Sequence, residues 1–159
     1  MKTILPFLQL ILIFMLSNCS TPRTVEKTDF SHTDYKSYPV YGGKDLGLTY
    51  SPKSSLFKLW APTATQVKLK LYDAGIEGKP VKEAVMAKAG NGVWAVTLDG
   101  NQKGKFYAFQ VEVDGKWLAE VPDPYAKAVG VNGLRGMVTD LKSTNPKDWD
   151  KDKRPILAS

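Results

Sequence analysis

The stretch FKLWAPTATQVKLKLY, from Phe57 to Tyr72, carries two alternating patterns, one on each side of Pro62. Before the proline, apolar residues alternate with a lysine and a tryptophan. After it, they alternate with a glutamine and two lysines. A period of two with lysine on one side is typical of strands that cover a core with their other side. The stretch therefore predicts two β-strands that turn one face to a core and the other to solvent.

Similar short patterns recur along the chain and predict about seven to eight strands in all. Asn91-Gly92 and Asp114-Gly115 are dipeptides that favour two-residue hairpin turns. No stretch shows the period of an amphipathic helix. The expected strands are residues 46–50, 55–61, 65–73, 82–88, 93–98, 105–113, 116–121 and 135–141. Many short strands separated by turn signals predict an all-β sandwich, here over residues 38–145.

The N-terminal segment has the pattern of an export signal. Lys2 precedes an apolar run over residues 4–16, which is too short to cross a bilayer as a helix. The run ends before Cys19, the only cysteine, in a sequence that resembles a bacterial lipobox. This resemblance implies a signal peptide over 1–18, a lipid on Cys19 and a membrane-anchored lipoprotein exported to the cell envelope. An ordinary signal peptide with an incidental cysteine, or an uncleaved anchor, are the alternatives.

Residues 19–37 are polar and lack an apolar period, so we expect them to form a flexible tether. The chain has 159 residues and a formal net charge of +6, but its lysines are spread singly rather than in a block. Isolated lysines are the usual way in which strand surfaces stay soluble, so we expect no nucleic acid partner.

The residues that commonly perform catalysis are scarce. His32 is the only histidine and lies in the tether, which excludes a Ser-His-Asp or Cys-His arrangement and a histidine-based zinc site within the sandwich. The carboxylates lie mainly in or beside expected turns, where acidic residues are usually turn formers. We therefore expect no catalytic residue, no metal, no cofactor and no enzymatic activity in this chain.

Aromatic side chains are the remaining candidates for a binding site. Sugars stack their C–H faces on exposed indole rings, and Trp117 follows the Asp114-Gly115 turn, where a side chain can stand at the edge of a sandwich. Packing in the core is the equal alternative for Trp117. For Trp60 and Trp94 we expect core or inter-domain packing.

Five motifs occur in order along the folded part of the chain: FKLWAP (57–62), GVW (92–94), GKFYAF (104–109), DPYA (123–126) and NGLRGMVTDL (132–141). Together they resemble the family 48 carbohydrate-binding modules, which precede the catalytic barrel of starch- and glycogen-debranching enzymes of glycoside hydrolase family 13. The similarity implies an immunoglobulin-like sandwich. The segment over 132–149 is similar to the one that leads into the barrel of bacterial type I pullulanases, which hydrolyse α-1,6 branches in pullulan, starch and glycogen.

The resemblance implies a non-catalytic module that binds α-glucan or braces a catalytic barrel. Glycogen-binding members use two tryptophans, a lysine and an asparagine; Trp117 matches one tryptophan, and Gln110 stands near the lysine position. The candidate glucan-binding residues are Trp117, Lys116 and Gln110, with weak binding of about millimolar order. Residues 146–159 are expected to be a linker toward an absent catalytic domain, so that the chain is a truncated fragment. The alternatives are a stand-alone surface glucan-binding protein and a protein-binding immunoglobulin-like module.

Overall fold

The structure is a computed structural model that describes residues 35–154. The predicted signal peptide, the predicted lipidation of Cys19 and nearly all of the predicted tether lie outside the described residues. Within residues 35–154, no helix combines the length and the apolar character that crossing a membrane would require.

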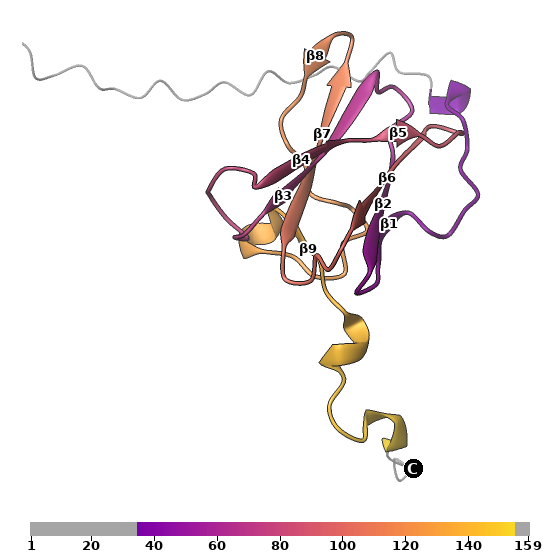
Figure 1. Ribbon diagram of the computed structural model, residues 1–159. Coiled ribbons are helices and arrows are strands. Elements are labelled where there is room, and N and C mark those ends of the chain that lie inside the picture. Colours follow the sequence, from indigo (N-terminus) through magenta and orange to yellow (C-terminus); the bar gives the residue numbers. More distant parts are fainter. Residues whose placement is uncertain (1–34, 155–159) are drawn as a thin grey trace, which may run out of the picture. The chain divides into compact units, whose positions relative to one another are not determined.

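The described residues form two antiparallel sheets, which confirms the predicted immunoglobulin-like all-β sandwich (Figure 1). One sheet has the strand order β1-β2-β6-β5, and the other has β4-β3-β7-β8 with β9 also paired to β7. The strands are β1 (Gly47–Tyr50), β2 (Ser54–Trp60), β3 (Gln66–Tyr72), β4 (Lys82–Val85), β5 (Ala87–Lys88), β6 (Val93–Asp99), β7 (Phe106–Val113), β8 (Lys116–Trp117) and β9 (Gly136–Met137). Short 3-10 helices cover Tyr35–Ser37, Val131–Gly133, Leu141–Thr144 and Trp149–Lys151.

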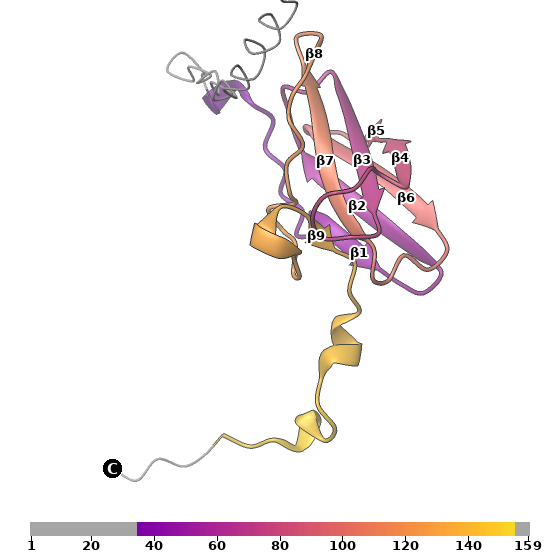
Figure 2. The ribbon, with the colours of Figure 1, turned by 90° about the vertical axis from the view of Figure 1, so that its left-hand side faces the viewer.

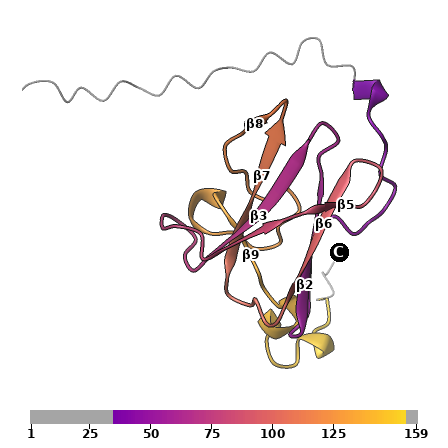
Figure 3. The same ribbon diagram turned by 45° about the horizontal axis from the view of Figure 1, so that its top comes forward.

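The two halves of the 57–72 stretch lie in different sheets. Strand β2 pairs with β6 and strand β3 pairs with β7, as Figures 2 and 3 show from two directions. Phe57 and Leu59 of β2, and Val67 of β3, are buried between the sheets, as their alternation predicted. Pro62 lies where the chain passes from one sheet to the other. The change of sheet is what allows both apolar faces to meet.

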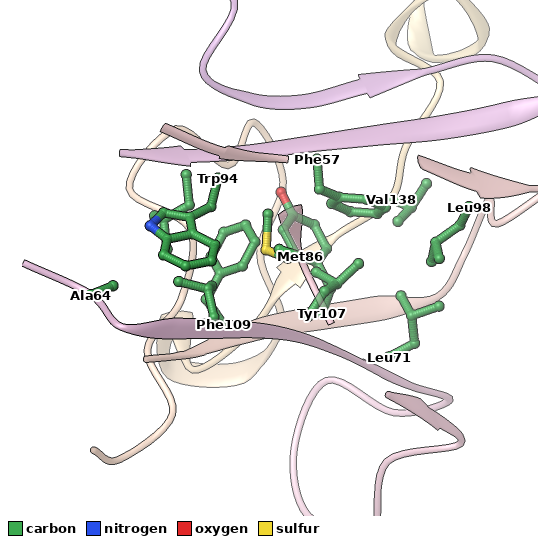
Figure 4. Close-up of a cluster of buried hydrophobic side chains, with 12 residues drawn as sticks. Phe57, Ala64, Leu71, Met86, Trp94, Leu98, Tyr107, Phe109 and Val138 are labelled. Carbon is green, nitrogen blue, oxygen red and sulfur yellow. The ribbon is translucent and has the colours of Figure 1, made fainter. Parts of the chain in front are cut away.

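Aromatic and aliphatic side chains from both sheets fill the core (Figure 4). The Phe57 and Tyr107 rings meet edge to face with centroids 4.9 Å apart, and Phe109 continues the cluster at 6.0 Å from Tyr107. Trp94 is also buried and donates its indole N–H to the carbonyl oxygen of Ala61 at 3.1 Å. The prediction of core packing is therefore confirmed for Trp94.

Both predicted hairpin turns are present. Asn91 and Gly92 have φ angles of 49° and 74° between β5 and β6, and Asp114 and Gly115 have φ angles of 50° and 73° between β7 and β8. Positive φ at both central residues gives the turn a twist that matches the flanking strands. The second turn fixes where β8, and with it Trp117, lies against β7.

The prediction of a single strand over 82–88 is wrong. Strand β4 pairs with β3 in one sheet, while β5 pairs with β6 in the other. Met86 lies between them, is 2% exposed and donates its backbone N–H to Val67 at 2.9 Å. The chain crosses between the sheets at Met86, whose side chain lies in the core.

Two other expected strands are shorter than predicted. Strand β8 ends at Trp117, and residue Val121 returns to the sheet only as an isolated bridge with Phe109. Strand β9 covers only the second and third residues of the expected 135–141 strand, and a 3-10 helix begins at Leu141. Alternation thus predicts the positions of β8 and β9 in the sequence correctly but overestimates their lengths.

Candidate functional site

Trp117 stands on the outer side of the sheet formed by β4, β3, β7 and β8. It lies opposite Glu112 in the β7–β8 ladder, whereas Phe109 and Val111 of β7 face the core side. The indole is half-buried, and the Lys68 ammonium lies 4.4 Å from the ring centroid. A cation at this distance from an indole is attracted by the negative face of the ring. Trp117 is therefore held at the surface and is absent from the hydrophobic core cluster.

Gln110 and Lys68 lie directly opposite each other in the β3–β7 ladder. The Gln110 side chain donates a hydrogen bond from Nε2 to the carbonyl oxygen of Leu118 at 3.0 Å, just after the end of β8. Three neighbouring strands thus bring together Trp117, Gln110 and Lys68, which we name the Trp117 site. It offers an indole ring, an ammonium group and a side-chain amide.

Lys68 was missed by sequence reasoning, which placed the polar partners of Trp117 at Gln110 and Lys116. Lys116 pairs with Val113 and precedes Trp117, so strand alternation directs it to the opposite side of the hairpin. Lys68 reaches the site because the register of the β3–β7 ladder sets it opposite Gln110. No local pattern in the sequence carries that register.

A charged network lies farther along the same outer face. Glu120 accepts hydrogen bonds from the Lys70 ammonium at 2.9 Å and from the Tyr72 hydroxyl. Burial alone would raise the pKa of Glu120, but these two hydrogen bonds and the charges of Lys70 and Arg135 together lower it overall. Glu120 is therefore held as a carboxylate, whereas a general acid needs a raised pKa. The network is suited to holding the sheet surface in place.

Arg135 joins this network from a distant part of the sequence. Its guanidinium carbon lies 3.4 Å from the centroid of the Tyr72 ring. Its Nη1 donates to the carbonyl oxygens of Ala74 at 2.8 Å and Glu77 at 2.6 Å. Arg135 thus fixes the loop after β3 to the chain segment that leads into β9.

Trp60 lies outside the core. Of the two expected roles, core packing and inter-domain packing, the first is therefore wrong. It is 38% exposed and donates its indole N–H to the carbonyl oxygen of Pro39 at 3.2 Å. The Tyr38 ring meets it edge-on with centroids 6.4 Å apart. Together these contacts place Trp60 at the wall of a groove of about 300 Å³.

Asp123 is the one carboxylate in the buried core of the described residues, at 4% exposure. It accepts hydrogen bonds from the Tyr107 hydroxyl at 2.7 Å and from the backbone N–H of Tyr125 at 2.8 Å. Burial raises the pKa of Asp123, and the two hydrogen bonds oppose that effect in part. Asp123 ties the 123–126 stretch to the core.

Several apolar side chains of the 129–134 segment and one of the C-terminal segment are open to solvent. Val129, Val131 and Leu134 are each more than half exposed, and Trp149 is 57% exposed. Exposed apolar side chains of this kind are expected on a module that packs on a second domain.

Comparison with known proteins identifies the class of protein that this fold represents. The family model of carbohydrate-binding module 48, described as the isoamylase N-terminal domain, matches residues 45–126, just over half of the chain. The chain therefore belongs to the carbohydrate-binding module 48 family. This module is a non-catalytic part of pullulanases.

The relatives confirm the resemblance to the pullulanase members of the family. The pullulanase of Bacillus subtilis (strain 168) is 38% identical over 98 residues, which are 62% of this chain and 13% of that protein. A crystal structure of pullulanase from Paenibacillus barengoltzii is 47% identical with a TM-score of 0.69, covering 76% of this chain and 18% of that one. The pullulanase of Bacillus acidopullulyticus is 41% identical with a TM-score of 0.68, covering 74% and 14%. The chain thus spans less than a fifth of the relatives it matches.

Proposed function

We propose that this module binds α-glucan, as found in starch, glycogen or pullulan, through the Trp117 site. The observation that carries the proposal is the half-buried Trp117 ring held on the outer face by Lys68. An indole offers a flat surface for the C–H face of a glucose unit. The Lys68 ammonium lies over one face of the ring, so the glucose unit would stack on the other face. Lys68 and the Gln110 amide supply groups that suit the sugar hydroxyls.

The site holds one indole, so the expected affinity is weak. A dissociation constant of about 1 mM corresponds to about −4 kcal/mol. Among the similar solved structures, the Paenibacillus barengoltzii pullulanase is known in complex with maltohexaose and alpha-cyclodextrin. That α-glucans bind to a protein containing this type of module supports the choice of ligand.

Titration of the whole chain with maltoheptaose, followed by tryptophan fluorescence and isothermal calorimetry, tests the proposal. We expect Trp117→Ala to weaken binding at this site at least about tenfold, which corresponds to about 1.4 kcal/mol. Trp149→Ala is the matched control, because Trp149 is exposed and lies in the C-terminal segment. A well-folded chain that gives no saturable response would refute the proposal.

A second candidate function is to brace a pullulanase-type catalytic domain. The exposed side chains of Val129, Val131 and Leu134 favour it, because single exposed apolar residues are common but several within one short segment mark a contact surface. Sedimentation of the chain with a separately produced pullulanase catalytic domain would detect a complex. We expect the double variant Val131→Ser, Leu134→Ser to form less of that complex than the natural chain does. If the natural chain and the double variant formed the complex to the same extent, bracing through this surface would be refuted.

We also propose, from the sequence, that Cys19 carries a lipid anchor, that the chain is exported to the cell envelope and that residues 19–37 are the tether. Mass spectrometry of the protein purified from membranes would show a lipid at the N-terminus of the mature chain. Cys19→Ala should release the protein from the membrane fraction. An unmodified Cys19 in the membrane-bound protein would contradict the anchor.

A further inference from the structure

A second exposed tryptophan lies on the opposite side of the sandwich from the Trp117 site. Phe57 and Leu59 of β2 point into the core, so Lys58 and Trp60 lie on the outer face of the other sheet. Trp117, by the same rule, lies on the outer face of the sheet that contains β7. The two sheets lie between these indoles.

Trp60 forms one wall of the groove of about 300 Å³, which we name the Trp60 groove. Its lining is dominated by aromatic rings, and Trp60 and Tyr125 are 38% and 51% exposed. The lining residues are Tyr38, Pro39, Val40, Tyr41, Leu46, Trp60 and Tyr125. A concave site with aromatic walls and a few polar groups is the usual form of a small-ligand site.

One lining residue, Tyr41, is hydrogen-bonded to a charged pair formed by Asp45 and Lys58. Asp45 accepts from the Tyr41 hydroxyl and from the Lys58 ammonium. The hydrogen bond from Lys58, followed by that from Tyr41, lowers the pKa of Asp45, which therefore stays ionised. The phenol of Tyr41, and the carboxylate and ammonium group that its hydrogen bonds connect to it, can supply acceptors and donors for sugar hydroxyls.

The orientation of the Trp60 ring is already set without a ligand. Its N–H is bonded to the carbonyl oxygen of Pro39, and a Cβ atom at Gly92 would lie 3.0 Å from its Nε1. The glycine therefore allows the 90–92 turn to pack closely against one edge of the indole. A ring held in place loses little rotational freedom when a ligand stacks on it.

We propose that the Trp60 groove is a second binding site for an α-glucan segment, so that one module holds two glucan chains on opposite faces. The choice of ligand class rests on the proposed function of the Trp117 site. Two weak sites on one body raise the retention on a polymeric ligand well above that of either site, provided both can engage together. The module would then bridge neighbouring chains of a branched glucan.

The test is a titration of the isotope-labelled whole chain with maltoheptaose, followed by two-dimensional NMR. We expect saturable shift changes at two separate groups of amides: around Val40, Tyr41 and Lys58, and around Lys68 and Trp117. Trp117→Ala should abolish the second group and change the apparent dissociation constant of the first by less than twofold.

Two variants address the groove itself. Tyr125→Ala removes an exposed ring, and Val40→Lys adds a long charged side chain at a position that is 85% exposed and carries little risk to folding. Each should weaken binding at the groove at least fivefold and leave the Trp117 site within twofold. Retention on amylopectin should fall more in the Trp117→Ala, Val40→Lys double variant than the single variants predict, with Trp149→Ala as the neutral control.

The outcomes separate this inference from the proposed function. Shift changes confined to the Trp117 site would overturn the second site and leave the proposed function standing. If the shift changes at the Trp60 groove vanished in Trp117→Ala, the second site would also be overturned. The groove amides would then be responding to glucan bound at the Trp117 site. A chain that shows no shift changes at either site would refute both.

Discussion

Asp123 shows how one buried carboxylate links the sequence motif DPYA to the core. Its two donors come from Tyr107 and from the backbone of Tyr125, and its side chain is almost fully enclosed. In the sequence, Asp123 resembles the other carboxylates beside expected turns, because local composition does not reveal that Tyr107 reaches it across the sandwich. Burial of the ionised form has a free-energy cost that depends on pH.

Asp123→Asn should change the pH dependence of stability in a defined direction. Because the pKa of Asp123 is raised above 3.8 in the folded state, its contribution to the free energy of unfolding is largest below that pH. The contribution is lost as pH rises through the folded value. The stability of the natural chain minus that of Asp123→Asn should therefore decrease as pH rises from about 3 to 7. Urea unfolding across this range measures it.

Glu120→Gln is the matched comparison, because the pKa of Glu120 is lowered in the folded state. Its contribution is present above the unfolded pKa and is lost as pH falls through the folded one. The corresponding stability difference should increase with pH. A parallel pH dependence in the two variants would contradict the assignment of opposite shifts.

In the Trp117 site too, the sequence predicts residues that have a local signal and misses those that depend on contacts between distant strands. Trp117 was identified because the turn before it is a local signal. Lys68 was not, because four further strands separate it from Trp117 in the sequence and it meets Trp117 only through the β3–β7–β8 register. Whether a tryptophan such as Trp60 lies inside or outside depends on which face of its strand is covered.

At the scale of elements, the hairpin from β7 to β8 carries the clearest prediction. Gly115 has a φ of 73°, a conformation that costs residues with a side chain about 1–2 kcal/mol. Gly115→Ala should therefore lower the free energy of unfolding by about 1 kcal/mol and weaken glucan binding by displacing Trp117. Urea unfolding and the maltoheptaose titration measure the two effects.

Gly42→Ala is the control for this prediction. Its φ does not lie in the left-handed region, and no atom lies within 4 Å of an added Cβ. It should change stability by less than about 0.5 kcal/mol. Equal losses in the two alanine variants would show that the turn conformation is not responsible.

The 82–88 stretch marks the limit of pattern reasoning at this scale. Its alternation correctly predicts extended backbone in both halves of the stretch. Alternation does not show that the first half pairs in one sheet and the second half in the other. The deciding fact is that Met86 fits the core between the sheets and that its backbone bonds to Val67. Such a crossing depends on the assembled core and has no local signature.

At the scale of the whole molecule, Arg135 connects parts of the chain that are far apart in sequence. It stacks on Tyr72 and donates to two carbonyl oxygens in the loop after β3. Arg135→Lys keeps the charge but loses the planar group that stacks and donates at once. We expect a loss of about 1–2 kcal/mol in the free energy of unfolding.

Arg154→Lys provides the control, since Arg154 is an exposed arginine near the end of the described residues. Its substitution should leave the urea midpoint unchanged, while that of Arg135→Lys moves to lower urea. If both midpoints stayed at the natural value, Arg135 would contribute nothing beyond its charge.

The crossing at Met86 has a consequence for many copies of the chain crowded together. Strands β4 and β5 are the outermost strands of their sheets, so one continuous stretch borders both sheets along the same side. Lys82, Glu83 and Lys88 keep this border charged and exposed. Short, charged, interrupted borders resist strand-by-strand joining between molecules. Crowded modules should therefore remain separate particles along this side and not grow into fibrils.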